Sequence, residues 1–166
     1  MILGDYIKFI DKLLTKLYQL GVDVSHYEMD HIGYQTSSNA DYDRLKPEFQ
    51  KIGELLTEDI IGGRRVGIFK LSSSLKYKQY VISAIELIAP KEGQVCPSAL
   101  EHAEFVIDRD FKSFMSCYPN LTWDTSAINQ DFYAMLKLKL GKTTQVKFHR
   151  IPVLEIVKLR TKTGNK

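Results

Sequence analysis

The sequence predicts an α+β fold in which paired βαβββ modules form one curved mixed sheet around a cavity, with an extra helix at the N-terminus. Two segments, residues 29–35 and 100–106, each place an acid before a histidine and then run on as an apolar, strand-like stretch. Each segment is followed by a helix-like stretch and then by further strands. A duplicated unit that brings one imidazole per copy to a shared centre explains this pattern.

The composition is that of one globular domain over residues 1–166. A chain of 166 residues with 44% hydrophobic and 26% charged residues is long enough to bury a core and has ordinary values for both fractions. The net charge of +3 is weaker and less clustered than nucleic-acid modules carry, so we expect no nucleic-acid partner. No apolar run approaches the roughly 20 residues that span a bilayer, and the N-terminus does not read as a signal peptide.

The two cysteines indicate a reducing compartment. Cys96 and Cys117 lie in unrelated contexts without the spacing of a redox or metal motif, which argues against a disulfide framework. We therefore expect a cytoplasmic protein in which both thiols are packing residues.

The N-terminal helix is expected within residues 1–22. Asp5 is placed to cap it, and Gly21 supplies the stop at its C-terminus. Apolar residues recur at helical spacing in between: Tyr6, Phe9, Ile10, Leu13, Leu14 and Leu17. This helix precedes the first module and should pack on the sheet as an appendage.

The first module is expected over residues 27–90, beginning with the strand that contains His31. Asn39 is the expected N-cap of a helix over residues 40–51, in which Pro47 should cause a kink or restrict the first turns. Three strands complete the module: residues 54–61 and 64–71, which form a hairpin around Gly62-Gly63, and residues 78–88.

The second module is expected over residues 100–150, with a less regular pattern. Its expected elements are a strand that begins at His102, a helix over residues 108–118, a short strand over 121–123, a polar loop over 124–131, and a hairpin over 132–140 and 143–149. A closing helix is expected over residues 152–160, and residues 162–166 should be disordered. The alternative is a single irregular α+β sheet, because the halves share little sequence outside the histidine strands.

Alternation along the strands predicts a polar inner face. Side chains of a strand alternate with a period of two, which places His31 with Gln35, and His102 with Glu104. Asp30 should point away from His31 and lie at the surface. Glu101 and Glu104 are candidates to orient an imidazole, and Glu104 is also a candidate ligand because it shares a face with His102.

Two more strands contribute a candidate ligand each. Glu86 is the one carboxylate in an apolar run, and burying it without a partner would be costly. The last strand ends at His149. The set His31, Glu86, His102 and His149 suits a divalent metal ion, zinc or else iron, nickel or manganese. The alternatives are an ion pair of Glu86 with Arg64, Lys70 or Lys147, and a His149 that only caps the sheet.

Several short motifs carry a resemblance to a known family. They are Asp30-His31-Ile32, Gly53-Glu54-Leu55-Leu56, Phe69-Lys70-Leu71, Ile85-Glu86-Leu87, Glu101-His102 with Glu104, Gly141-Lys142-Thr143-Thr144 and Lys147-Phe148-His149. From Met1 to Leu159 the chain resembles the YecM family, which is similar to the vicinal oxygen chelate superfamily of glyoxalase I, extradiol dioxygenases and bleomycin-resistance proteins.

The resemblance implies a metal-site cavity with ligands on the first and fourth strand of each module. These positions are His31, Glu86, His102 and His149. In glyoxalase-type isomerases the last position is a glutamate that also transfers the proton, so a histidine there departs from the pattern. His149 would then be the fourth ligand or a general base.

The leading hypothesis is a metal-dependent enzyme of this superfamily, an isomerase, lyase or dioxygenase-like protein, acting on a small oxygen-rich substrate. Candidate substrate-binding residues, for a substrate that carries an anionic group, are Gln35, Arg64, Lys70, Glu104 and Lys147, with Tyr133 and Trp123 as an aromatic wall. The alternative is a non-catalytic small-molecule or metal-binding protein of the bleomycin-resistance type. A homodimer is the assembly we consider for either.

Overall fold

The structure is a computed structural model of the chain and describes residues 2–162. The first half contains α1 (Tyr6–Gln19), β1 (Glu28–Gln35), α2 (Asn39–Gln50), β2 (Gly53–Ile61), β3 (Arg64–Tyr77) and β4 (Tyr80–Ile88). The second half contains β5 (Ala99–Val106), α3 (Phe111–Ser116), β6 (Asp124–Ala127), β7 (Met135–Lys139), β8 (Gln145–His149) and α4 (Val153–Lys162).

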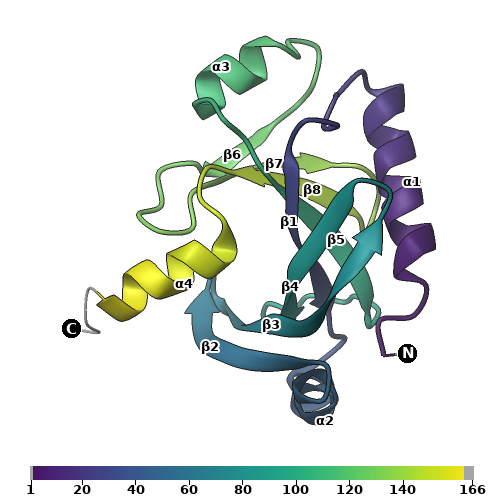
Figure 1. Cartoon of the computed structure of the whole chain (residues 1–166), viewed down its shortest axis with the longest axis vertical. Helices are drawn as coiled ribbons and strands as arrows, with labels where there is room; N and C mark the ends of the chain where they lie inside the picture. Colours follow the sequence, from purple (N-terminus) through teal and green to yellow (C-terminus); the bar gives the residue numbers. More distant parts are fainter. Residues whose placement is uncertain (1, 163–166) are drawn as a thin grey trace.

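The described strands form one eight-stranded sheet in the order β2-β3-β4-β1-β5-β8-β7-β6 (Figure 1). In each half the first strand pairs in parallel with the last one, β1 with β4 and β5 with β8, and the remaining strands continue outward as antiparallel neighbours. The halves meet at the antiparallel pair of β1 and β5. The predicted α+β fold of paired βαβββ modules is confirmed.

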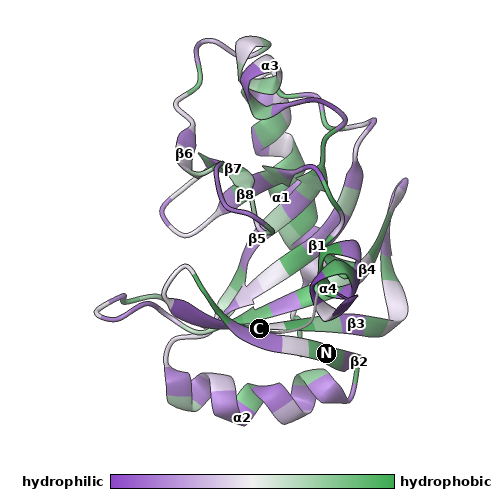
Figure 2. Cartoon of the chain, turned by 90° about the vertical axis from the view of Figure 1, so that its left-hand side faces the viewer, coloured by the Kyte–Doolittle hydropathy of each residue, from purple (hydrophilic) through white to green (hydrophobic). Residues whose placement is uncertain are grey.

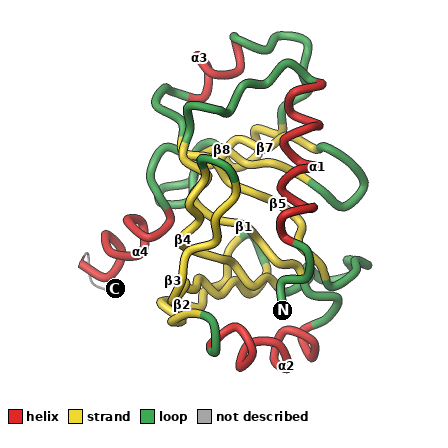
Figure 3. Tube along the Cα trace, turned by 45° about the vertical axis from the view of Figure 1, so that its right-hand side comes forward, coloured by secondary structure: helices red, strands yellow, loops and turns green. Residues whose placement is uncertain are grey.

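The N-terminal helix has the predicted ends. The side chain of Asp5 accepts a hydrogen bond from the Lys8 N–H, and Gly21 follows the helix with a φ of 74°, a left-handed conformation that favours glycine. Ile10, Leu13 and Leu17 are buried in the core. In Figure 3 this helix and α2 lie on the outside of the strands.

Helix α2 begins one residue earlier than predicted. Its N-cap is Ser38, because this residue is extended and its hydroxyl accepts from the Asp41 N–H, whereas Asn39 is already helical. Pro47 lies inside the helix. Most of α2 is hydrophilic (Figure 2), and its buried residues Tyr42, Leu45 and Phe49 face the sheet.

The two faces of the sheet have different partners. Helices α1, α2 and α3 cover the outer face, where Ile32, Ile85 and Phe105 belong to one large apolar core. On the inner face α4 packs Val153 and Val157 against a smaller cluster with Val66, Ile68, Ala84 and Ile88. The inner face beside this cluster holds the polar residues discussed below.

The prediction was less accurate in the second module. Strand β5 starts at Ala99 rather than at His102, α3 covers only Phe111–Ser116, and a strand occupies Asp124–Ala127 where a polar loop was expected. Residues 121–123 are not a strand, because Leu121 and Trp123 pack against the core instead of pairing with β7. The closing helix is confirmed and includes Lys162, while the rest of the expected disordered tail lies outside the described residues.

Two smaller expectations can be compared directly. Cys96 and Cys117 are both free thiols, but Cys117 is exposed, so the expectation that both are packing residues is wrong for Cys117. Within residues 2–162 no helix combines the length and the apolar character that a bilayer crossing needs.

Candidate metal centre

Strands β1, β4, β5 and β8 place polar side chains on the inner face at the centre of the sheet. Apolar neighbours point to the outer core, so alternation turns the polar residues inward. The buried polar and charged residues of this face include His31, Glu86, His102, Glu104, Lys147 and His149. The predicted meeting of polar residues from both halves is thus observed.

Four of these side chains converge with metal-like spacing. One ligand atom each from His31, Glu86, His102 and Glu104 can be chosen so that all lie within 4.8 Å of one another. Nε2 of His31 lies 3.5 Å from Glu86 and 3.3 Å from Glu104, and Nε2 of His102 lies 3.2 Å from each of the same two carboxylates. When four ligand atoms surround an ion tetrahedrally at about 2.1 Å, they lie about 3.4 Å from one another. The donor set therefore fits a divalent ion.

Each histidine is oriented by the acid that precedes it. The Nδ1 atoms of His31 and His102 lie 2.8 Å from Asp30 and 2.7 Å from Glu101. A carboxylate can only accept, so each Nδ1 carries the proton, and each Nε2 is left to face the centre. Carboxylates that fix histidine rings in this way are the usual outer partners of metal-bound imidazoles.

Two β-bulges explain how adjacent residues can make these bonds. The pairing of β1 with β5 shifts between Met29 and His31, and again between Gly33 and Tyr34, so that Asp30 and Glu101 have no partner in the ladder. The prediction that Asp30 lies at the surface is wrong, because the bulge breaks strict alternation. Asp30 is buried and also accepts from the Val153 N–H at the start of α4.

The carboxylates around the centre favour positive charge on His31 and His102. Burial opposes ionisation of both histidines, yet Glu104 and Glu86 raise the pKa of His31 well above its usual value. Burial and Lys147 oppose ionisation of His102, but Glu101, Glu104 and Glu86 raise its pKa to about 9. A proton, an ammonium group or a metal ion at Nε2 would each supply this charge.

The acids of the centre are ionised despite their burial. Burial favours their neutral forms, but Lys147 and His31 hold the pKa values of Glu86 and Glu104 well below the usual range. Burial likewise opposes ionisation of Glu101, while His102 lowers its pKa to about 2. Nε2 of His31 is buried and makes no standard hydrogen bond within the described residues. A buried nitrogen that makes no hydrogen bond although two ionised carboxylates lie within 3.5 Å of it calls for a proton or a cation between them.

Lys147 enters the centre from β8. Its Nζ donates to Oε1 of Glu104 at 2.6 Å and lies 3.9 Å from Oε2 of Glu86. It also lies 3.0 Å from Nε2 of His102, to which it can donate while that nitrogen carries no proton. Burial disfavours its charge, but Glu104 and Glu86 raise its pKa above the usual value. The ion pair of Glu86 with Lys147 that we weighed from the sequence is therefore part of this cluster.

His149 lies beside the four donors rather than among them. Its Nδ1 donates to the Ile151 carbonyl at 2.7 Å, and its Nε2 lies 3.4 Å from Asp30 and 3.9 Å from Glu104. Burial lowers its pKa, so the ring is neutral near pH 7. With Asp30 and His31 it forms a second group of candidate ligands.

A cavity of about 570 Å³ leads to the centre, and Glu86, Glu101 and Lys147 are in its wall. Arg64 lines it too, and its Nη1 donates to Oε1 of Gln35 at 2.7 Å. Tyr133 contributes the expected aromatic surface. Not every residue that was expected to bind the substrate lies at this cavity.

Two candidates lie elsewhere. Lys70 is exposed on β3. Trp123 packs against Phe114 and Phe148 in the outer core, so the expectation that it forms part of an aromatic wall is wrong.

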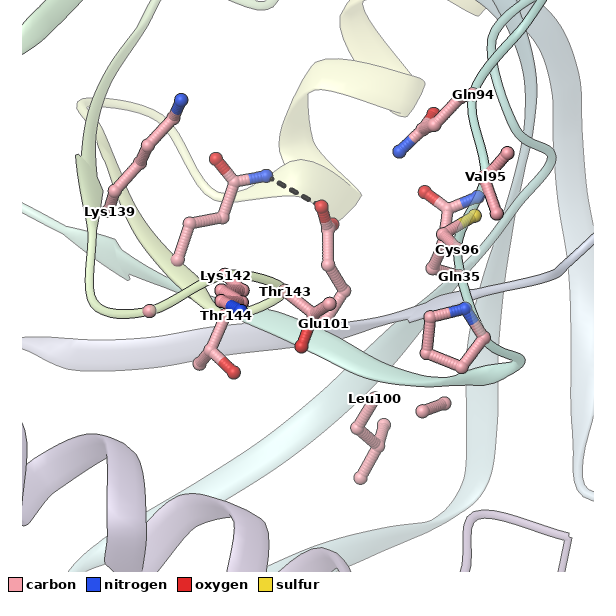
Figure 4. Close-up of a pocket in the computed structure, with 14 residues that line it drawn as sticks. Gln35, Gln94, Val95, Cys96, Leu100, Glu101, Lys139, Lys142, Thr143 and Thr144 are labelled. Atoms are coloured by element: carbon pink, nitrogen blue, oxygen red, sulfur yellow. Dashed lines mark hydrogen bonds between the residues drawn. The ribbon is translucent and has the colours of Figure 1, made fainter.

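A second cavity of about 270 Å³ adjoins the other side of Glu101. Figure 4 shows Lys139 on one side of Glu101 and Gln94, Val95 and Cys96 on the other. The Gln145 amide donates to Oε1 of Glu101 at 2.9 Å, while the other oxygen holds His102. The carboxylate that orients His102 is thus itself held in place.

The sequence of the chain matches the family described as YecM protein over residues 1–152. The chain belongs to the YecM family. Protein YecM of Escherichia coli (strain K12) is 29% identical over 171 residues, which cover 94% of this chain and 90% of that protein. The expected family is confirmed.

Solved structures support the same fold. A structure described as Structural Genomics, Protein EC4020 has a TM-score of 0.77 and 26% identity, covering 95% of this chain and 91% of that one. A variant of methylmalonyl-CoA epimerase from Streptomyces coelicolor, solved with 2-nitronate-propionyl-CoA, has a TM-score of 0.50 and 13% identity, covering 73% and 93%. The YecM family chain therefore shares the fold of vicinal oxygen chelate proteins.

Proposed function

We propose that this protein is a metal-dependent enzyme of the vicinal oxygen chelate type that acts on a small, oxygen-rich substrate. The observation that carries the proposal is the convergence of two imidazoles, one from each half, with two buried carboxylates at ligand-like spacing. His31, Glu86 and His102 are the proposed ligands from the sequence, and Glu104 joins them as the fourth donor. Two nitrogen and two oxygen donors suit zinc, iron, nickel or manganese.

A divalent ion in this centre would supply a Lewis acid for two neighbouring oxygens of a substrate. Asp30 and Glu101 hold the two imidazoles with Nε2 inward, so the donors need little rearrangement. His149 is the proposed general base, because its ring is neutral, buried and fixed through Nδ1. Its Nε2 makes no hydrogen bond within residues 2–162 and is open to accept a proton.

We propose that the substrate of the large cavity carries an anionic group, because basic side chains contribute to the wall. Arg64, Lys137 and Lys139 lie in its wall together with Lys147. Glu86, Glu92, Glu101 and Asp124 lie in the same wall and balance part of this charge, but Glu101 is committed to His102 and Gln145, and Asp124 to Lys137. Arg64 is held by Gln35 through a neutral amide, which leaves its charge available to a carboxylate or phosphate.

Metal content of purified variants tests the proposal. We expect about one divalent ion per chain, and at least a tenfold loss of bound metal in either His31→Ala or His102→Ala with the fold intact by circular dichroism. His26→Ala is the matched control, because His26 is exposed on a connecting segment. Unchanged stoichiometry in both centre variants would remove the ligand assignment.

The second candidate function is a binding protein that holds a small molecule without chemistry. The observation that favours it is Lys147, which gives Glu104 and Glu86 a cation from the chain itself. A protein that takes up no ion during titration but still binds small anions in the cavity would favour this function. The cytoplasmic location and a homodimer stay predictions, to be tested by cell fractionation and by light scattering.

A further inference from the structure

The internal repeat gives Lys147 a specific place. Asp30-His31 and Glu101-His102 are equivalent pairs, since both have the acid at a bulge and the histidine Nε2 facing the centre. Starting from these pairs, the parallel ladders can be compared position by position.

In the first half His31 lies opposite Ala84, and Gly33 lies opposite Glu86. In the second half His102 lies opposite Gln145, and Glu104 lies opposite Lys147. Lys147 is therefore the counterpart of Glu86. The repeat predicts that position 147 supplies the fourth ligand, but this position carries a cation. His149 lies two residues further along β8.

The missing ligand is replaced from another position. Glu104 occupies the position equivalent to Gly33, and its carboxylate completes the donor set. The ammonium of Lys147 contacts this carboxylate at 2.6 Å and the His102 Nε2 at 3.0 Å. Two of the four donors are thus already bonded to a cation of the chain, and a third, Glu86, is 3.9 Å away.

An ammonium group and a divalent ion compete for the same atoms. The lone pair of His102 Nε2 can bind one of them, and like charges held a few ångströms apart repel strongly in a buried setting. The Lys147 side chain has room to leave, because it lines the cavity of about 570 Å³ next to the centre.

We propose that the ammonium of Lys147 is a resident counter-cation of the donor set, which a divalent ion must displace toward the cavity. This inference rests on the proposed function and adds a residue that weakens metal binding while it stabilises the metal-free form of the protein. Displacement would also leave the ammonium facing the cavity, where it joins Arg64 in attracting an anionic group. Metal binding and binding of an anion in the cavity would then support each other.

Titration of Zn²⁺ alone into the full chain, followed by calorimetry, tests the proposal. Lys147→Met removes the charge and should bind Zn²⁺ at least tenfold more tightly than the unchanged chain. Lys147→Gln should shift the affinity in the same direction, and Lys147→Arg, which keeps the charge, should not. Lys137→Met is the matched control, because Lys137 lines the same cavity but pairs with Asp124 at 3.4 Å, and it should stay within about twofold.

Thermal unfolding gives a second measurement. Without metal, Lys147→Met should melt below the unchanged chain, because ionised carboxylates lose their cation. Saturating Zn²⁺ should then raise its melting temperature by more than it raises that of the unchanged chain. If Lys147→Met does not fold, the Gln and Arg variants carry the same comparison.

The outcomes separate this inference from the proposed function. Histidine-dependent Zn²⁺ binding that is equal or weaker in the Met and Gln variants overturns the inference alone. Zn²⁺ binding that appears only in the Met and Gln variants supports the inference, and it contradicts the proposal that the unchanged protein holds a metal ion. Absence of binding in every variant overturns both.

Discussion

The imidazole of His102 fills the space that a side chain on Gly33 would need. A Cβ at position 33 would lie 2.1 Å from Cε1 and 2.4 Å from Nε2 of this ring. The backbone of Gly33 is not in the left-handed region, so the requirement comes from the neighbouring ring and not from φ. Position 33 of β1 therefore has no side chain, and the imidazole of His102 on β5 occupies this space and reaches the centre.

Gly33→Ala should damage the centre and the fold together. The new methyl group must push the buried ring away from Glu86 and Glu104, so we expect at least a tenfold loss of metal affinity. Overpacking of this kind costs about 1–3 kcal/mol of stability. Denaturant unfolding and metal titration measure the two effects. Gly141→Ala is the control, because a Cβ there meets nothing within 4 Å, and equal behaviour of the two variants would contradict the packing argument.

Asp30→Ala should destabilise the protein by about 3 kcal/mol. The substitution leaves the buried His31 Nδ1 and the Val153 N–H without their shared acceptor. Asp30→Asn keeps an oxygen that can accept from Val153 and should cost clearly less. Urea unfolding of the two variants measures the difference. Similar losses in both would show that the acceptor bond to α4 contributes little.

Glu101→Gln should weaken metal binding about 10–100-fold while leaving the four donors in place. The amide removes the charge that fixes the protonated Nδ1 of His102, although it can still accept one hydrogen bond. Calorimetric titration with Zn²⁺ measures the effect. Glu92→Gln is the control, since Glu92 lines the cavity and is exposed. An equal loss of affinity in both variants would indicate that removing any negative charge of the cavity weakens metal binding, and that orientation of the His102 ring is not the cause.

The Asp59–Arg160 ion pair should make α4 sensitive to acid. The two side chains approach to 2.5 Å and join β2 to α4, and the bond to Arg160 lowers the pKa of Asp59. A carboxyl group that is more acidic in the folded state stabilises the fold above its unfolded pKa of about 3.9 and loses this contribution as the pH falls through the lower folded value.

The contribution is modest, about 0.2–1 kcal/mol, because the pair is partly exposed. The stability gap between the unchanged chain and Asp59→Asn should therefore be present at pH 7 and should shrink below about pH 3.9. Urea unfolding at several pH values measures it. A gap that stays constant down to about pH 2.5, well below the unfolded pKa, would contradict the assignment.

Much of the fold could be predicted because its signals are local. Asp5 and Gly21 mark the ends of α1, and Gly62-Gly63 mark the β2–β3 hairpin. The short strand at Asp124–Ala127 was missed because only tertiary pairing with β7 makes it a strand. Its polar sequence resembles a loop.

The centre was predicted in part for a similar reason. Alternation grouped His31 with Gln35 and His102 with Glu104, and Glu86 stood out as the one carboxylate in an apolar run. The structure brings His31, Glu86, His102 and Glu104 together. Alternation failed at Asp30, because a bulge depends on the pairing of two distant strands and has no signal within one strand. The repeated acid-histidine pair was the available signal, since Asp30 and Glu101 act alike. The place of Lys147 needed the ladder register, which the sequence does not contain.

X-ray absorption at the zinc edge of the loaded protein tests the central claim most directly, because it reports which atoms surround the ion. The account predicts two imidazole nitrogens at about 2.0–2.1 Å with oxygen ligands at similar distances, and loss of one imidazole in His31→Ala and in His102→Ala. A spectrum without imidazole scattering, or one that neither substitution alters, would contradict a centre shared by the two halves.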